Sequence, residues 1–147
     1  MRAYEALLKS HPEHGGRLAP GRATAARQLE HCASACTICA DACLSEDASS
    51  LRRCIRLTLE CADICALAGR SVLRHREADA TLLRPLLAAC VTACQLCRDE
   101  CDRHAPAHDH CRLCAMACRD AMRAVNELLG LLSDSGLGTT PALTREV

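Results

Sequence analysis

Cysteines recur in this chain at successive spacings of four, three and four residues, and this pattern constrains the fold more than any other feature. The first such group is Cys32, Cys36, Cys39 and Cys43. At about 100° per residue, these four positions fall within an arc of about 60° on an α-helix. Such an arc is the stripe that a helical bundle turns toward its core. The spacing therefore predicts a helix whose buried face is lined by sulfur.

The cysteine pattern repeats along the chain. The first group returns 58 positions later as Cys90, Cys94, Cys97 and Cys101. Two further stripes are Cys54, Cys61 and Cys65, and Cys111, Cys114 and Cys118, which Met122 continues. In the repeat Met122 matches Cys65, and Thr58 and Ala115 stand where a stricter heptad would have cysteine. Two helical hairpins, each with cysteines on both arms, are therefore expected.

Proline and glycine gather at residues 12–21 and again at 130–141, and the composition between these segments favours helix. β-branched residues are sparse, and no period-two alternation persists. The expected helices cover residues 22–44, 50–74, 81–103 and 109–132. The predicted fold is an all-α, antiparallel up-down-up-down four-helix bundle with a cysteine-lined core at one end. The predicted organisation is an N-terminal lead at 1–21 with room for a short helix, the bundle at 22–132 and a C-terminal tail at 133–147.

Aliphatic side chains continue the inward stripes beyond the cysteines. Leu83, Leu86 and Leu87 precede Cys90, and Val125, Leu129 and Leu132 follow Met122. In an up-down-up-down bundle, all fourteen thiols then share the end that holds the loops at residues 44–49 and 102–108. Leucine and valine fill the other end. We expect this aliphatic half to keep the metal-free chain folded.

The balance of charge and the scarcity of aromatic residues limit the classes of partner that the chain is expected to bind. The 18 lysines and arginines balance 18 aspartates and glutamates, whereas nucleic acids and acidic membranes demand clustered positive charge. There is no Trp or Phe for base stacking, and no apolar run approaches the length of a membrane span. We therefore expect neither a nucleic-acid nor a membrane partner.

The N-terminal residues 1–9 carry charges throughout, so the sequence does not resemble a secretory leader. High cysteine content is typical of a disulfide scaffold only in short secreted chains. We therefore expect a cytoplasmic location, where thiols stay free or bind metal.

Fourteen inward cysteines are too many for the usual role of cysteine as an occasional small buried hydrophobe. A disulfide lattice fits poorly, because neighbouring helix axes lie about 8 to 10 Å apart and most pairs would miss disulfide geometry. CxxC pairs at 36–39, 94–97 and 111–114 leave a thiol oxidoreductase as a weaker alternative, since no βαβ pattern accompanies them. Metal binding is the interpretation that the pattern favours.

A lining made almost wholly of thiolate selects Cu(I), zinc or iron–sulfur clusters. Structural zinc sites are closed sets of four ligands on tight turns, and iron–sulfur clusters take four cysteines from local loops. Cu(I) tolerates two or three thiolates, which neighbours at i, i+3 or i+4 on one helix supply. The sequence thus predicts many Cu(I) ions per chain and no enzymatic activity. A zinc or mixed-metal thiolate buffer remains the alternative.

The repeated CxxxCxxCxxxC helices, CASACTICADAC from Cys32 and CVTACQLCRDEC from Cys90, resemble the bacterial copper storage proteins of the cytosolic branch. The resemblance covers roughly residues 22–132 and includes the cysteine-rich second and fourth helices and the histidine-rich turn. It implies a homotetramer of four-helix bundles that stores many Cu(I) ions per protomer. A copper chaperone or a small-molecule copper carrier is the partner expected to deliver them.

The candidate metal ligands are the fourteen cysteines and the histidines of the predicted turn. They are Cys32, Cys36, Cys39, Cys43, Cys54, Cys61, Cys65, Cys90, Cys94, Cys97, Cys101, Cys111, Cys114, Cys118, His104 and His108, with His110 and Met122 as additional candidates. An imidazole at this end is expected to receive Cu(I) and pass it to Cys101 or Cys111, and the resemblance implies His104 and His108 for this position. His31, His75, Asp63 and Met116 are expected to face away from the thiols or to lie far from them.

Overall fold

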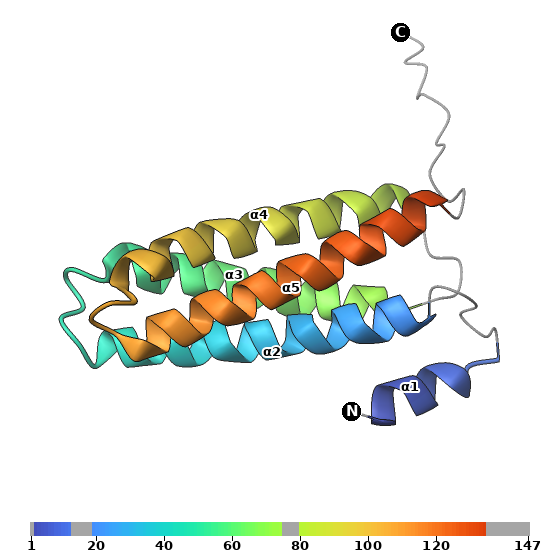
Figure 1. Cartoon of the computed structure of the whole chain (residues 1–147), viewed down its shortest axis with the longest axis horizontal. Helices are drawn as coiled ribbons and strands as arrows, with labels where there is room; N and C mark the ends of the chain where they lie inside the picture. Colours follow the sequence, from blue (N-terminus) through green and yellow to red (C-terminus); the bar gives the residue numbers. More distant parts are fainter. Residues whose placement is uncertain (1, 13–18, 75–79, 135–147) are drawn as a thin grey trace, which may run out of the picture.

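The computed structural model describes residues 2–12, 19–74 and 80–134, and within these ranges all regular structure is helical. The five helices are α1 (Arg2–Lys9), α2 (Ala19–Leu44), α3 (Arg52–Val72), α4 (Ala80–His104) and α5 (Asp109–Asp134). Each of the four long helices packs against the next, and α5 closes the ring against α2 (Figure 1). This arrangement confirms the predicted four-helix bundle.

The helix ends differ from the predicted ends by up to three residues. Helix α2 begins at Ala19 because Pro20 lies in its first turn, where the missing backbone N–H has no helical partner to lose. Gly21 also belongs to this turn, and a Cβ there would lie 2.9 Å from Leu131 Cδ1, so glycine permits the close approach of α5. Helix α3 begins only at Arg52, because Ser50 Oγ donates to the carbonyl of Asp47 and holds a turn instead.

The bundle has a sulfur-lined half and an aliphatic half. The α2–α3 and α4–α5 loops lie together at one end of the molecule (Figure 1). By their residue numbers, the cysteines occupy the helix segments next to these loops. At the opposite end the fully buried side chains include Leu29, Val72, Leu87, Leu128 and Leu132. The predicted division of the core is confirmed.

The course of α5 refines one expectation. Met122 is only half-buried at the margin of the core, whereas the buried positions after Cys118 are Ala121, Ala124, Val125, Leu128 and Leu132. Steps of three and four residues alternate from Cys111 onward, so the inward line bypasses residue 122. Met122 thus continues the sulfur stripe only at its edge, half-buried and packed against the core.

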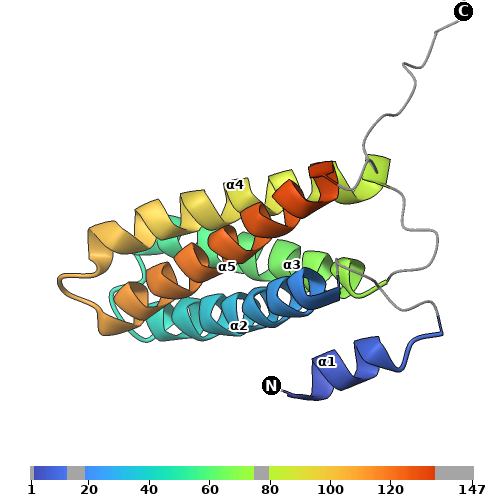
Figure 2. The ribbon, with the colours of Figure 1, turned by 45° about the vertical axis from the view of Figure 1, so that its right-hand side comes forward.

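Two polar contacts secure the aliphatic end. Buried Arg22 donates through one guanidinium nitrogen to the carbonyls of Val72 and Arg74, which lie at the C-terminal end of α3 and have no partner further along the helix. Helix α1 lies beside α2, as both views show (Figures 1 and 2). The Tyr4 hydroxyl of α1 donates to the Glu30 carboxylate of α2.

Helix α4 is long and apolar enough, by length and composition alone, to cross a membrane. Its apolar face is occupied in the bundle, however, since the buried residues of α4 include Leu83, Leu87 and all four of its cysteines. The sequence-based statement that no apolar run approaches the length of a membrane span is therefore wrong for α4.

Candidate metal centre

All fourteen cysteines are free thiols with at most 1 % of their surface exposed. Each long helix contributes its inward stripe, as the spacing predicted. Contacts of 4.0 Å or less connect the sulfurs into three groups, which follow one another along the bundle axis. We call these the mouth group, the middle group and the deep group.

The mouth group lies next to the two loops and takes sulfurs from all four long helices. Its members are Cys39, Cys43, Cys54, Cys101 and Cys111. The Sγ–Sγ distances are 3.7 Å from Cys54 to Cys101, 3.9 Å from Cys39 to Cys111 and 4.0 Å from Cys54 to Cys111. His110 adjoins this group, with Nδ1 3.4 Å from the sulfur of Cys39 and 3.5 Å from that of Cys111.

The middle group comes from α2, α4 and α5. Its members are Cys32, Cys36, Cys97, Cys114 and Cys118. The sulfur of Cys36 is central, since it lies 3.6 Å from Cys114 and 3.8 Å from Cys97. No sulfur of helix α3 lies within 4.0 Å of this group, but Cys61 of α3 forms with Cys32, Cys36 and Cys118 a set of four sulfurs whose mutual distances are within 4.8 Å. The α3 residue between Cys54 and Cys61 on the inward stripe is Thr58, which is fully buried and donates its hydroxyl to the carbonyl of Cys54 at 2.8 Å.

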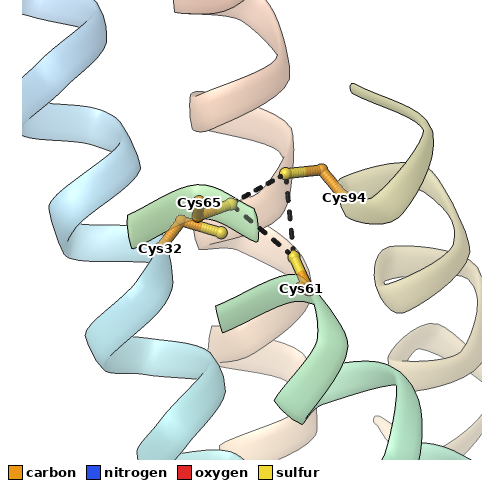
Figure 3. Close-up of side chains that lie close together, drawn as sticks. All are labelled: Cys32, Cys61, Cys65 and Cys94. Atoms are coloured by element: carbon orange, nitrogen blue, oxygen red, sulfur yellow. Dashed lines mark hydrogen bonds between the residues drawn. The ribbon is translucent and has the colours of Figure 1, made fainter. Parts of the chain in front are cut away.

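The deep group joins α3 to α4. Its members are Cys61, Cys65, Cys90 and Cys94, with neighbouring sulfurs 3.5 to 3.8 Å apart. Figure 3 shows three of these thiols pointing toward one another, with Cys32 of the middle group beside them. Cys32 belongs to a set of four sulfurs with Cys61, Cys65 and Cys94 in which all mutual distances are within 4.8 Å.

These distances suit metal ions bridged by sulfur. With a metal–sulfur bond of about 2.3 Å, two thiolates on one ion lie at most about 4.6 Å apart. The observed contacts of 3.5 to 4.0 Å therefore let neighbouring thiols share an ion with little movement of the helices. Several overlapping sets of four thiols have all mutual sulfur distances within 4.8 Å, so one sulfur can serve more than one ion.

The three histidines at the mouth have different surroundings. Of the three, His110 is the one whose imidazole lies against thiols, although the sequence analysis gave it only as an additional candidate after His104 and His108. His104 Nε2 lies 3.2 Å from Oε1 of Glu100, and His108 Nδ1 lies 3.4 Å from Oε1 of Glu46. All three rings are partly exposed. His104 and His108 therefore sit at the rim and His110 between rim and sulfur.

Two glutamates that the sequence analysis did not single out hold these histidines. Glu100 is almost fully buried and also accepts from Arg53 Nε at 3.0 Å, which fixes its carboxylate. Its i,i+4 spacing to His104 was a signal readable in the sequence. Glu46 lies 3.7 Å from Nε2 of His110 and thus spans from one loop to the other. The sequence carries no signal for this contact, because loop–loop proximity depends on tertiary packing.

Burial and hydrogen bonds between thiols shift the pKa values of the metal-free cysteines, upward at some positions and downward at others. Burial raises the pKa of Cys111 to about 11, because a thiolate there loses hydration. The pKa of Cys36 is also raised, first by its hydrogen bond with Cys114 and then by its other thiol neighbours and burial. The hydrogen bond with Cys65, by contrast, lowers the pKa of Cys90 to about 5. Metal binding must displace the protons of the thiols that are neutral in the empty bundle.

The remaining expectations concern residues outside the sulfur lining. His31, Asp63 and Met116 are exposed, as predicted. His75 lies outside the described residues, as does most of the predicted tail.

The profile of a family described as copper storage protein matches residues 21–130 of this chain. Among solved structures, the copper storage protein Ccsp of Streptomyces lividans, loaded with 10 copper equivalents, is 43 % identical with a TM-score of 0.84. That comparison covers 86 % of this chain and 98 % of the other. A second structure, of a cytosolic copper storage protein of the same organism with five coppers, is 46 % identical with a TM-score of 0.74 and covers 76 % and 93 %.

A curated relative is the uncharacterized cysteine-rich protein YhjQ of Bacillus subtilis (strain 168). It is 42 % identical over 87 residues, which make up 58 % of this chain and 75 % of the relative. The comparisons thus agree with the sulfur-lined helices in both sequence and fold.

Proposed function

Because this chain belongs to the copper storage protein family, we propose that it stores many Cu(I) ions in its thiol-lined bundle and detoxifies copper by sequestering it. The observation that carries this function is the set of fourteen buried thiols with neighbouring sulfurs 3.5 to 4.0 Å apart. Thiolates are the soft ligands that Cu(I) prefers. The core that a bundle normally fills with leucine is here a binding surface for metal.

The chemistry of storage is ligand exchange with proton release. Each thiol that binds Cu(I) gives its proton to solvent, and the monovalent ion cancels the charge of the new thiolate. Buried charge is costly unless it is paired, so filling the bundle with cations and thiolates in step keeps that cost low. No oxidation is required, and the helices provide the ligands already in place.

We propose the fourteen cysteines as the ligands of the stored ions, with His110 as the imidazole that contacts the mouth group. His104 and His108 act before it, as rim positions from which an incoming ion moves to His110 and then to Cys39 or Cys111. Their carboxylate partners favour this role, since a hydrogen bond to one ring nitrogen fixes the tautomer and directs the other toward metal. We assign Met122 no ligand role, because it lies at the margin of the core.

An anaerobic titration with a chelator that competes for Cu(I) tests the storage function. The reduced chain is expected to take up many equivalents, with thiolate-to-copper absorption in the ultraviolet rising until the bundle is full. A matched sample whose thiols are alkylated in denaturant serves as control and should lose this capacity. Saturation of the reduced chain at one or two equivalents would contradict the proposal.

Storage rather than catalysis is the role we propose, so the metal-free chain should not turn over a disulfide substrate. A thiol oxidoreductase would reduce many equivalents of substrate per chain with an external reductant. Consumption of only as many equivalents as the chain has thiol pairs is the result expected for a store.

We further propose a cytoplasmic homo-oligomer, a tetramer by the family resemblance, that receives copper from a chaperone or a small-molecule carrier. Exposed leucines on the outer face of α3 and α4 support an oligomer, among them Leu59, Leu67 and Leu96. A groove of about 260 Å³ between these helices is lined by Leu57, Ile64 and Leu96. Light scattering after size-exclusion chromatography should give a mass several times that of one chain, and Leu96→Glu should lower it. A monomeric mass for the unmodified chain would remove this part of the proposal.

A further inference from the structure

We propose that four thiols of the mouth group form a preorganised tetrahedral site for one divalent, borderline-soft metal ion, Zn²⁺. These thiols, the mouth quartet, are Cys39, Cys54, Cys101 and Cys111. The inference goes beyond Cu(I) storage, because it assigns a second metal of different charge and geometry to one defined place in the lining.

The geometry of the mouth quartet matches a closed zinc site. Each of the four long helices contributes one sulfur, and all mutual distances are within 4.8 Å. The three closest pairs are 3.7, 3.9 and 4.0 Å apart. A tetrahedron with zinc–sulfur bonds of about 2.3 Å has edges of about 3.8 Å. The quartet therefore needs only small adjustments to enclose the ion.

This arrangement removes the argument by which the sequence disfavoured zinc. That argument assumed that a closed set of four thiols comes from tight turns, whereas each helix here carries a stripe. The structure closes the set between helices instead of along one. Register between the helices, which the spacing within each helix does not report, brings Cys54 level with Cys101 and Cys111.

Electrostatics favours the mouth over the middle group. A divalent ion with four thiolates carries two net negative charges, and such a centre needs hydrogen-bond donors when it is buried. His110 Nδ1 lies within 3.5 Å of the sulfurs of Cys39 and Cys111, so an Nδ1–H tautomer donates to both. A comparable set of four around Cys36 has other thiols as its closest partners. The mouth quartet is thus the better place for the doubly charged centre.

Binding at the mouth quartet is an exchange of protons for metal. One Zn²⁺ forms four Zn–S bonds, four S–H bonds break, and four protons pass to solvent. No electron is transferred. The bound ion also occupies the sulfurs that Cu(I) reaches first from His110, so zinc-loaded protein should take up its first Cu(I) more slowly than metal-free protein.

The test uses the reduced, metal-free, full-length chain under anaerobic conditions and Co²⁺ as the spectroscopic substitute for Zn²⁺. The first equivalent of Co²⁺ should give the intense visible absorption bands of a tetrahedral tetrathiolate site. It should also shift the NMR signals of the imidazole protons of the neighbouring His110. One equivalent of Zn²⁺ should abolish the bands. A pale octahedral spectrum, or tetrahedral bands without a shift at His110, would overturn the proposal.

Variants locate the site. Cys101→Ser should lose the tetrathiolate spectrum of the first equivalent, whereas Cys90→Ser, a matched change in the deep group, should keep it. Cys54→Ser repeats the test at a second helix if Cys101→Ser does not fold, which circular dichroism reports. An unchanged first-equivalent spectrum in the folded mouth variant would overturn the assignment. A parallel Cu(I) titration separates the two functions, because Cu(I) loading without Co²⁺ binding refutes this inference and leaves copper storage intact.

Discussion

At the scale of single residues, the mouth of the bundle is defined by the contacts of its imidazoles. His110 touches the sulfurs of Cys39 and Cys111, while His104 and His108 face carboxylates. An imidazole can exchange a metal ion with an adjacent thiol without releasing the ion to solvent. Loss of His110 should therefore affect the rate of copper uptake more than it affects the number of Cu(I) ions that the chain can bind.

His110→Ala should slow the first phase of Cu(I) uptake severalfold while the final number of ions changes little, because the fourteen thiols remain. Stopped-flow absorption at low copper-to-protein ratio measures the rate. His31→Ala removes an exposed imidazole on the outer side of α2 and is the control that should leave the rate unchanged. Equal rates for the two variants would remove His110 from the uptake route.

Thr58 is the other residue whose position has a specific consequence. It stands on the inward stripe of α3 between Cys54 and Cys61, and its hydroxyl is directed back to its own helix at the carbonyl of Cys54. The side chain thus fills space without offering a soft ligand.

Thr58→Cys should raise Cu(I) capacity by about one ion per chain, because the new thiol adds a buried soft ligand between Cys54 and Cys61. Thr58→Val keeps the shape without a ligand and should leave capacity as it is. Competitive chelator titration of both variants decides the point. A capacity that stays the same in Thr58→Cys would show that the existing thiols already saturate this part of the lining.

At the scale of helices, stability and binding reside in different halves of the same elements. Helix α4 shows this clearly, since Leu83 and Leu87 are buried near its start and Cys90 to Cys101 follow. The leucines pack against their neighbours in the absence of metal, whereas the thiols are the proposed ligands for it. Helix packing at the aliphatic end therefore holds the sulfurs near their binding positions before any metal arrives.

Leu87→Ala should lower the free energy of unfolding of the metal-free chain by about 2 to 5 kcal/mol, the usual result of emptying a buried leucine site. Chemical denaturation followed by circular dichroism measures it. Leu82→Ala, on the same helix with 72 % of its side chain exposed, should change stability by less than about 0.5 kcal/mol. Similar losses in both variants would mean that the aliphatic half does not carry the fold.

At the scale of the whole molecule, the thiols couple stability to pH. Burial raises the pKa of Cys111 to about 11, above the value of about 8.5 for an unfolded thiol. Between these values the folded chain binds more protons than the unfolded chain, so stability falls as pH rises. Below about pH 8 this contribution is fully present.

The melting temperature of the metal-free chain should therefore fall between about pH 9 and pH 11. Copper-loaded protein has already released the thiol protons and should lack this dependence. Differential scanning calorimetry of both forms across this range measures the difference. A metal-free melting temperature that rises over the same range would contradict the direction of the thiol pKa.

Metal loading should also leave the helical content nearly unchanged, because the bundle is formed by its aliphatic half and by helix–helix contacts along its length. Far-ultraviolet circular dichroism before and after Cu(I) addition checks this. A coil-like spectrum of the metal-free chain would show that metal, rather than the split core, folds the protein.

The sequence by itself determined which face of each helix carries sulfur. Spacings of three and four residues on a helix of 3.6 residues per turn place the cysteines on one face. The same periodicity places Asp63 and Met116 on the outer face, where both are exposed. The sequence also predicted the division of the core into a sulfur-lined half and an aliphatic half, since leucine and cysteine follow one another on the same stripes. Helix ends were less readable, because turn hydrogen bonds such as that of Ser50 compete with the first helical turn.

Only the tertiary structure decided which sulfurs of different helices meet, and therefore where groups of ligands close. The approach of Cys54 to Cys101 and the gap left by Thr58 depend on the relative register of the helices. The placement of His110 against thiols, and of Glu46 beside it, depends on how two loops fold over one end. Local periodicity reports the direction of a side chain around its own helix axis, but register and loop contacts arise from packing between segments distant in sequence.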